Sequence, residues 1–124
     1  MLNDKRLVAF VPTKDFAKAR QFYETTLGLR FVAEDGHAVV FDANGTMLRI
    51  SKAGNFTPLP FTILGWQSDD IAVDVAALQK RGVEFERYGF FEQDELGIWT
   101  APTGDKVAWF KDPDGNILSV SEHV

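Results

Sequence analysis

Cysteine is absent from this chain of 124 residues. Its absence excludes a disulfide framework, a thiol nucleophile and a cysteine metal site. Long apolar runs are missing as well. The apolar run at 7–11 is too short to span a membrane, and no small-residue cleavage signal follows it. We therefore expect a cytoplasmic protein that makes no membrane contact.

Positive charge and histidine are also scarce. The chain has 13 Lys and Arg against 18 Asp and Glu, for a net charge of -5, which argues against a nucleic-acid partner. Of the two histidines, His37 follows an acidic turn and is expected to be exposed, while His123 lies beside Glu122 near the C-terminus. Without a dependable histidine we predict no Ser-His-Asp relay, and no nucleophile-elbow or phosphate-loop motif is present.

What the chain does have is an internal repeat. Residues 15–23, followed by 27–31, have a counterpart in residues 70–78, followed by 81–85. Each half is predicted to run strand, Asp-led helix, glycine stop, strand and hairpin, with the hairpins at 39–51 and 108–121. A composition of 45% hydrophobic residues is enough for one domain over 1–124. We expect module one at about 5–52 and module two at about 60–122, with a shared core.

Capping and turn residues support these elements. The first helix is capped by Thr13 or Asp15 and the second by Ser68 or Asp69, and Gly28 and Gly82 are placed to end them in a left-handed conformation. Both hairpins carry a tight-turn pair, at 44–45 and 114–115, in which positive φ is expected at both positions. The segment 87–99 is an insertion absent from the first module. Its sequence fits a functional loop and a solvated hairpin equally well.

The chain resembles the vicinal oxygen chelate superfamily in three features. These are the duplicated pattern, the first helix that ends in Phe22-Tyr23 before Leu27-Gly28-Leu29, and the run at 109–116. That superfamily includes glyoxalase I, bleomycin resistance proteins and extradiol dioxygenases. The resemblance covers about 7–120. It implies an α+β fold of two tandem βαβββ modules, which form curved mixed sheets around a cup with helices on the outer face.

The resemblance also locates the family's metal ligands, which come from the first and last strand of each module. Those positions fall on Val8, Ile63, Arg49 and Ser119, where the metal enzymes carry mainly His and Glu. None of the four is a suitable ligand, and arginine repels a cation. We therefore expect no metal and no cofactor.

Strand alternation then predicts the lining of the cup. The same parity that points residues 49 and 119 inward turns Leu48, Ile50, Leu118 and Val120 toward the helices. Trp66 and Trp109 are expected mainly in the core, and Phe90 is a further rim candidate. The predicted ligand-binding residues are Val8, Phe10, Met47, Arg49, Ser51, Ile63, Gln67, Phe91, Trp99, Ser119 and Ser121.

Arg49 leaves two interpretations open. Either it forms a structural ion pair with Asp42 across the hairpin, or a ligand completes its shell, and the nearby serines favour the second.

The leading function is a metal-free small-molecule binding protein that forms a homodimer. One alternative is a metal-dependent lyase or dioxygenase whose ligands come from an unusual set such as His37, Glu92, Asp94, Glu122 or His123, in which His37, His123 or the loop from Glu92 to Glu95 supplies the metal site. The others are a metal-free enzyme in which Arg49 stabilises an oxyanion, and a subunit with a vestigial cup. The ligand, any catalytic residues and whether a reaction occurs are not set by the sequence.

Overall fold

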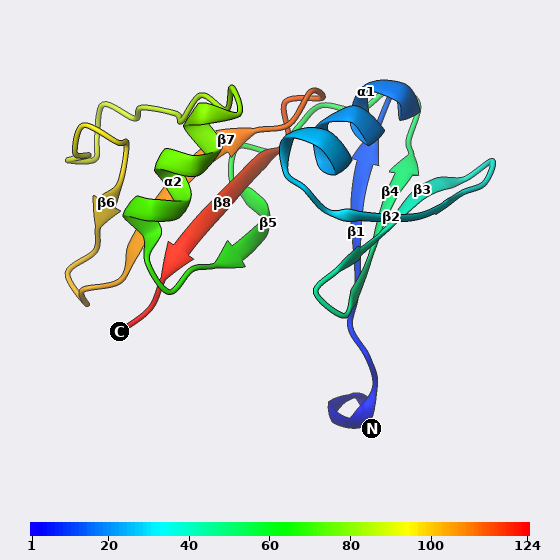
Figure 1. Cartoon of the computed structure of the whole chain (residues 1–124), viewed down its shortest axis with the longest axis horizontal. Helices are drawn as coiled ribbons and strands as arrows, with labels where there is room; N and C mark the ends of the chain where they lie inside the picture. The colour runs from blue at the N-terminus through cyan, green and yellow to red at the C-terminus, as the bar shows by residue number, and fades with distance from the viewer. The chain divides into compact units, whose positions relative to one another are not determined.

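The computed structural model describes residues 1–124. The chain divides into two compact units, Met1–Thr57 and Pro58–Val124 (Figure 1). None of the helices has the length and apolar character of a membrane-spanning segment.

The first unit begins with a short 3-10 turn, η1 (Leu2–Asp4), and then forms β1 (Val8–Thr13) and α1 (Phe16–Arg20). The helix continues as a wider π-helical segment, η2 (Gln21–Thr26). Three strands follow: β2 (Arg30–Glu34), β3 (Ala38–Ala43) and β4 (Thr46–Lys52). The sheet order is β1-β4-β3-β2, in which β1 and β4 are parallel and the other pairs antiparallel.

The second unit repeats this topology. It contains β5 (Thr62–Gln67), α2 (Ile71–Lys80), β6 (Trp99–Thr100), β7 (Lys106–Lys111) and β8 (Ile117–Glu122). The order β5-β8-β7-β6, with β5 and β8 parallel, matches that of the first unit strand for strand. The predicted α+β fold of two tandem modules is confirmed.

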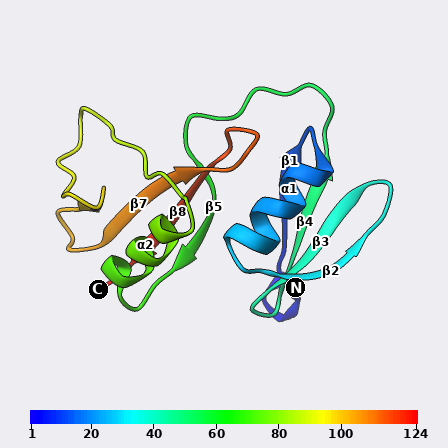
Figure 2. The same cartoon turned by 45° about the horizontal axis from the view of Figure 1, so that its top comes forward.

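Each helix covers one face of its own sheet (Figure 2). Leu48 and Ile50 on β4, and Leu118 and Val120 on β8, are buried there at no more than 5% exposure, as alternation predicts. Aromatic packing completes both cores: Tyr23 meets Phe41 in the first, and Phe85 meets Phe110 in the second.

The predicted helix ends are largely correct. Gly28 and Gly82 adopt positive φ of 76° and 94°, and Asp15 caps α1 by accepting a hydrogen bond from the Lys18 N–H. The cap of α2 is Asp70, which accepts from the Val73 N–H, and not Ser68 or Asp69. Ser68 instead accepts from the Asp70 N–H, so it supports the cap from two residues before it.

Two further expectations are wrong. The strand expected after Gly82 is reduced to a single bridge between Phe85 and Phe110, and β6 takes the edge position instead. In the second hairpin only Gly115 has positive φ, whereas Asn44 and Gly45 both have it in the first. The buried Asp112 carboxylate accepts hydrogen bonds from the N–H groups of Asp114 and Asn116, which holds a longer loop in place of a two-residue turn.

Candidate functional site

The predicted lining residues of the first unit share one face of its sheet. The register places Val8 beside Met47, Phe10 beside Arg49, and Pro12 beside Ser51. This face is apolar and open, since Val8, Phe10 and Met47 are 41%, 64% and 45% exposed. It lies opposite the face that α1 covers.

Arg49 lies on this face and is partly exposed, but its partner is not the one expected. Its guanidinium lies 3.7 Å from the Asp35 carboxylate, in the turn between β2 and β3. Asp42 is bound by Arg30 at 3.1 Å and also accepts a hydrogen bond from the Gly45 N–H. The alternative of an Arg49–Asp42 ion pair is therefore wrong, although Asp42 does lie opposite Met47 as the register argument requires.

The lining residues of the second unit form two rows across its sheet. One row runs Gln67, Ser121, Val107 and Trp99, from β5 to β6. The next row runs Gly65, Ser119 and Trp109. Because directly opposed residues share a face, these side chains lie on the face away from α2. Ile63 lies at a bulge between Thr62 and Leu64, so it belongs to neither row.

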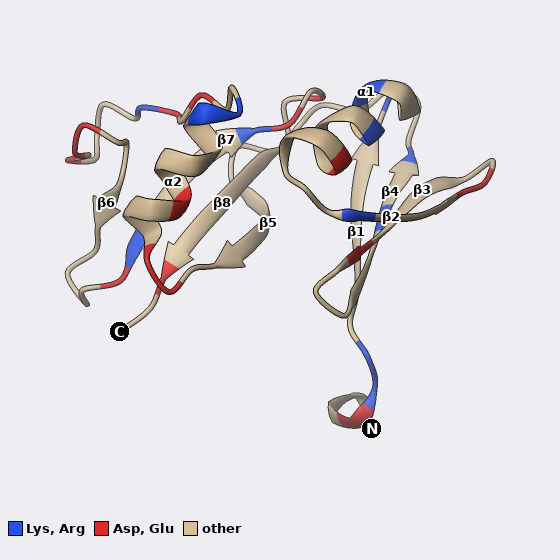
Figure 3. Ribbon diagram, in the orientation of Figure 1, with Lys and Arg blue, Asp and Glu red and all other residues tan.

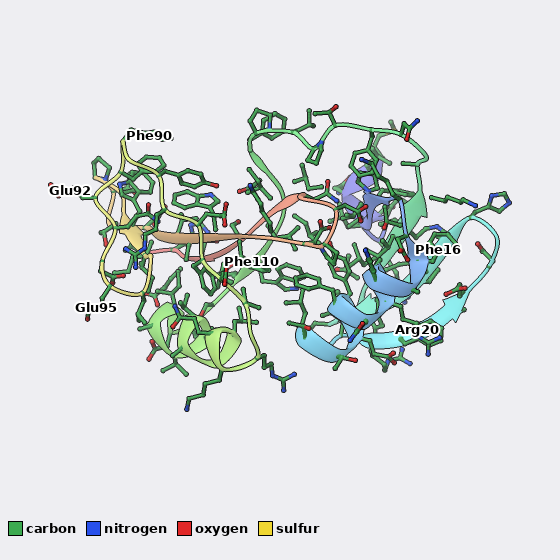
Figure 4. The ribbon with its side chains drawn as sticks, turned by 90° about the horizontal axis from the view of Figure 1, so that it is seen from above. Phe16, Arg20, Phe90, Glu92, Glu95 and Phe110 are labelled. Carbon is green, nitrogen blue, oxygen red and sulfur yellow. The ribbon has the colours of Figure 1, made fainter.

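Five aromatic side chains gather on this same face, and we call them the aromatic wall: Tyr88, Phe90, Phe91, Trp99 and Trp109. The Phe91 and Trp109 rings are stacked at 5.2 Å with an interplanar angle of 4°. Trp99 lies against both of them, with ring centroids 4.5 Å from Phe91 and 6.1 Å from Trp109. In Figure 4 Phe90 lies on the side of the sheet opposite α2, whereas Phe110 lies on the α2 side. Trp109 therefore belongs to this wall and not to the helix-covered core, contrary to expectation, while Trp66 does stack on Phe110.

Side-chain hydrogen bonds to the backbone hold the loop that carries the wall. The Gln93 amide donates to the carbonyls of Glu86 and Gly97 and accepts from the Tyr88 N–H. The Arg87 guanidinium donates to the carbonyls of Asp94 and Glu95 at 2.5 and 2.6 Å. These hydrogen bonds give the loop a defined conformation. Burial of the Tyr88 phenol raises its pKa, and the nearby Glu86 carboxylate raises it further.

An open hollow of about 490 Å³ lies against the wall. Its volume falls within the range typical of small-molecule sites. Glu92 contributes a carboxylate, and Figure 3 shows an acidic stretch in the loop before β6. The lining residues are Phe90, Phe91, Glu92, Gln93, Asp94, Ile98, Trp99 and Thr100.

The unusual metal-ligand set is dispersed. Asp94 accepts hydrogen bonds from the N–H groups of Leu96 and Ile98, and Glu122 accepts from the Ile71 N–H at the start of α2. His37 is exposed, as expected. No three His, Cys, Asp or Glu side chains come together in an arrangement that holds a metal ion.

His123, in contrast, makes two contacts that the sequence did not indicate. Its Nε2 lies 2.9 Å from the Ser121 hydroxyl, and its Nδ1 lies 3.3 Å from the Asp105 carboxylate. The structure therefore brings together a serine, a histidine and an aspartate that are not adjacent in the sequence. Asp105 comes from the loop before β7, and nothing in the local sequence links it to the end of β8.

Comparison with known proteins agrees with this architecture. The family model of the glyoxalase/bleomycin resistance protein/dioxygenase superfamily matches residues 6–120. The chain belongs to that superfamily. No curated protein matches it in sequence.

Solved structures show the same fold at low identity. The bleomycin resistance determinant encoded on transposon Tn5 has 22% identity and a TM-score of 0.75, with coverage of 96% of this chain and 98% of that one. A lactoylglutathione lyase from Agrobacterium tumefaciens has 20% identity and a TM-score of 0.71, with 96% and 93% covered. A glyoxalase/bleomycin resistance protein/dioxygenase from Alicyclobacillus acidocaldarius has 17% identity and a TM-score of 0.70, with 97% and 92% covered.

Proposed function

We propose that this chain is a metal-free small-molecule binding protein that takes flat aromatic ligands at the aromatic wall of its second unit. The observation that carries the proposal is the hollow of about 490 Å³ bounded by Phe91 and Trp99. Aromatic faces bind flat rings by stacking, and each such contact adds roughly 0.5–1.5 kcal/mol beyond simple burial.

Rigidity of the wall supports this proposal. The loop is held by Gln93 and Arg87, so little ordering is required when a ligand binds. Glu92 adds an exposed carboxylate at the edge of the hollow. A planar ligand that carries a positive charge would therefore gain from both the ring faces and the carboxylate.

The residues at the family's metal positions support a metal-free protein. Val8, Ile63 and Ser119 are poor ligands, and Arg49 is a cation beside Asp35. A metal-dependent lyase or dioxygenase remains the competing function. Elemental analysis of the purified protein separates the two, because one equivalent of tightly held transition metal after dialysis would favour the enzyme.

Calorimetric titration tests the proposal directly. The ligands are a panel of flat heteroaromatic cations, phenols and small aromatic acids, and the variants are Trp99→Leu and Trp99→Phe. We expect the cations to bind best, Trp99→Leu to weaken binding at least tenfold, and Trp99→Phe to retain most of it, because only leucine removes the stacking face.

Arg49→Met provides the second comparison, because Arg49 lies on the first unit's sheet. Binding that is lost in Arg49→Met but retained in Trp99→Leu would move the site to the face that carries Arg49. No binding of any panel member by the wild type at millimolar concentration would contradict a small-molecule site at the wall.

A further inference from the structure

The end of β8 carries a side-chain cluster that does not line the hollow at the aromatic wall. Ser121, His123 and Asp105 form a continuous chain of contacts, from hydroxyl to imidazole to carboxylate, at 2.9 and 3.3 Å. A nucleophile within hydrogen-bond reach of a base, with the base oriented by a third group, is the arrangement that activates serine for acyl transfer.

We propose that Ser121, His123 and Asp105 form an esterase-type relay that hydrolyses small aryl esters. Asp105 accepts a hydrogen bond from the protonated Nδ1 of His123, which leaves Nε2 free to accept the Ser121 proton. The N–H of Val124 and the His123 imidazole hold the pKa of Asp105 below its ordinary value, so this carboxylate is charged at neutral pH. The cluster is accessible, since the side chains of His123 and Asp105 are 50% and 32% exposed.

The neighbouring residue on β5 supplies an oxyanion donor. Gln67 lies directly opposite Ser121 on the same face, and its side chain is exposed. Its amide has two N–H donors and makes no hydrogen bond to the rest of the chain. A donor beside the nucleophile stabilises the negative charge that develops on the ester oxygen during attack.

The same row of the sheet specifies the substrate class. From Ser121 the row continues through Val107 to Trp99, about 10 Å away at the usual spacing of strands. A flat hydrophobic group bound over Val107 against Trp99 thus leaves its ester carbonyl at Ser121. Aryl esters have this shape. Their phenoxide leaving groups depart readily, so hydrolysis does not require the strong transition-state stabilisation of an enclosed site.

The chemical steps balance with water as the only co-reactant. The Ser121 oxygen attacks the carbonyl carbon while His123 takes the hydroxyl proton, and the tetrahedral intermediate expels the aryl oxide, which receives that proton from His123. Water, deprotonated by His123, then attacks the acyl-serine, and Ser121 leaves with the proton. The products are a carboxylic acid and a phenol or naphthol.

Hydrolysis of 1-naphthyl acetate by the full chain tests the relay. We expect Ser121→Ala and His123→Gln each to lower the rate about 100-fold, the usual contribution of a positioned base, and Gln67→Leu to lower it about 100-fold through loss of the oxyanion donor. His37→Gln is the matched control, because it removes the other exposed imidazole and should leave the rate unchanged. Mass spectrometry after brief incubation should find one acetyl group on Ser121.

Two outcomes would overturn the relay. One is a wild-type rate no higher than that of free imidazole at equal concentration. The other is a Ser121→Ala rate within twofold of wild type, since His123 would then act alone. Vinyl acetate separates this inference from the binding proposal: it has no ring for Trp99, so its Ser121-dependent hydrolysis reports the relay even if no ligand binds the wall.

Discussion

At the scale of single residues, Asp35 shows how a turn and an ion pair are combined. Its carboxylate accepts hydrogen bonds from the N–H groups of His37 and Ala38, and it lies near the Arg49 guanidinium. These backbone hydrogen bonds, more than Arg49, lower the pKa of Asp35. The sequence argument for Arg49 left two partners open, Asp42 or a ligand, and did not include Asp35. Strand register alone does not show that Arg30, on the neighbouring strand β2, forms the ion pair with Asp42.

The lowered pKa of Asp35 predicts a stability loss in acid. A carboxyl whose pKa is lower in the folded state stabilises the fold above its unfolded pKa, and this contribution is lost as the pH falls through the folded pKa. We expect Asp35→Ala to lower the urea midpoint at pH 7, and the difference from wild type to shrink below about pH 4.

Glu34→Ala is the control for net charge in this comparison, because Glu34 is the neighbouring exposed carboxylate. Urea midpoints of the wild type, Asp35→Ala and Glu34→Ala at pH 7 and pH 3 test whether the charged Asp35 carboxylate stabilises the fold. An Asp35→Ala difference of the same size at both pH values would show that the charged carboxylate does not stabilise this turn.

At the scale of elements, sequence pattern predicted the repeated topology well and the segment 83–100 poorly. Helix stops, strand parity and the first hairpin depend on local rules, which Gly28, Gly82 and Asn44 follow. The loop before β6 depends instead on contacts between its own side chains and backbone, such as those of Gln93, which have no periodic signature. The position of Trp109 outside the core has a related cause, because its partner ring, Phe91, comes from that loop.

Gly97 is the residue on which this loop depends most directly. Its φ is +88°, and a Cβ there would lie 3.2 Å from the Cβ of Phe85. Gly97→Ala therefore introduces both backbone strain and a close contact, and we expect it to cost about 1–3 kcal/mol of unfolding free energy. The same variant should weaken ligand binding at Trp99, because the loop loses its defined conformation.

Gly36→Ala is the matched control, since a Cβ at that position meets nothing within 4 Å. Chemical denaturation of both variants provides the measurement. Equal stability of Gly97→Ala and Gly36→Ala would show that the loop adapts without cost and that its conformation is not fixed by this glycine.

At the scale of the whole molecule, the exposed apolar face of the first sheet favours self-association. Val8, Phe10 and Met47 lie on neighbouring strands β1 and β4 and are each more than 40% exposed. A contiguous apolar patch of this kind is unusual on a protein that stays monomeric. The homodimer expected from the sequence would cover it, since a two-fold interface pairs one patch with itself or its neighbour.

Phe10→Glu tests this prediction. Phe10 is 64% exposed, so the substitution removes little internal packing, yet it places a charge where the dimer would exclude water. We expect light scattering at micromolar concentration to give a dimer mass for the wild type and a monomer mass for Phe10→Glu. Val73→Glu is the control, because Val73 is 61% exposed on α2, which belongs to the second unit, and so adds the same charge without altering the first sheet. A wild-type monomer, or equal dissociation of both variants, would show that the β1–β4 face does not mediate self-association.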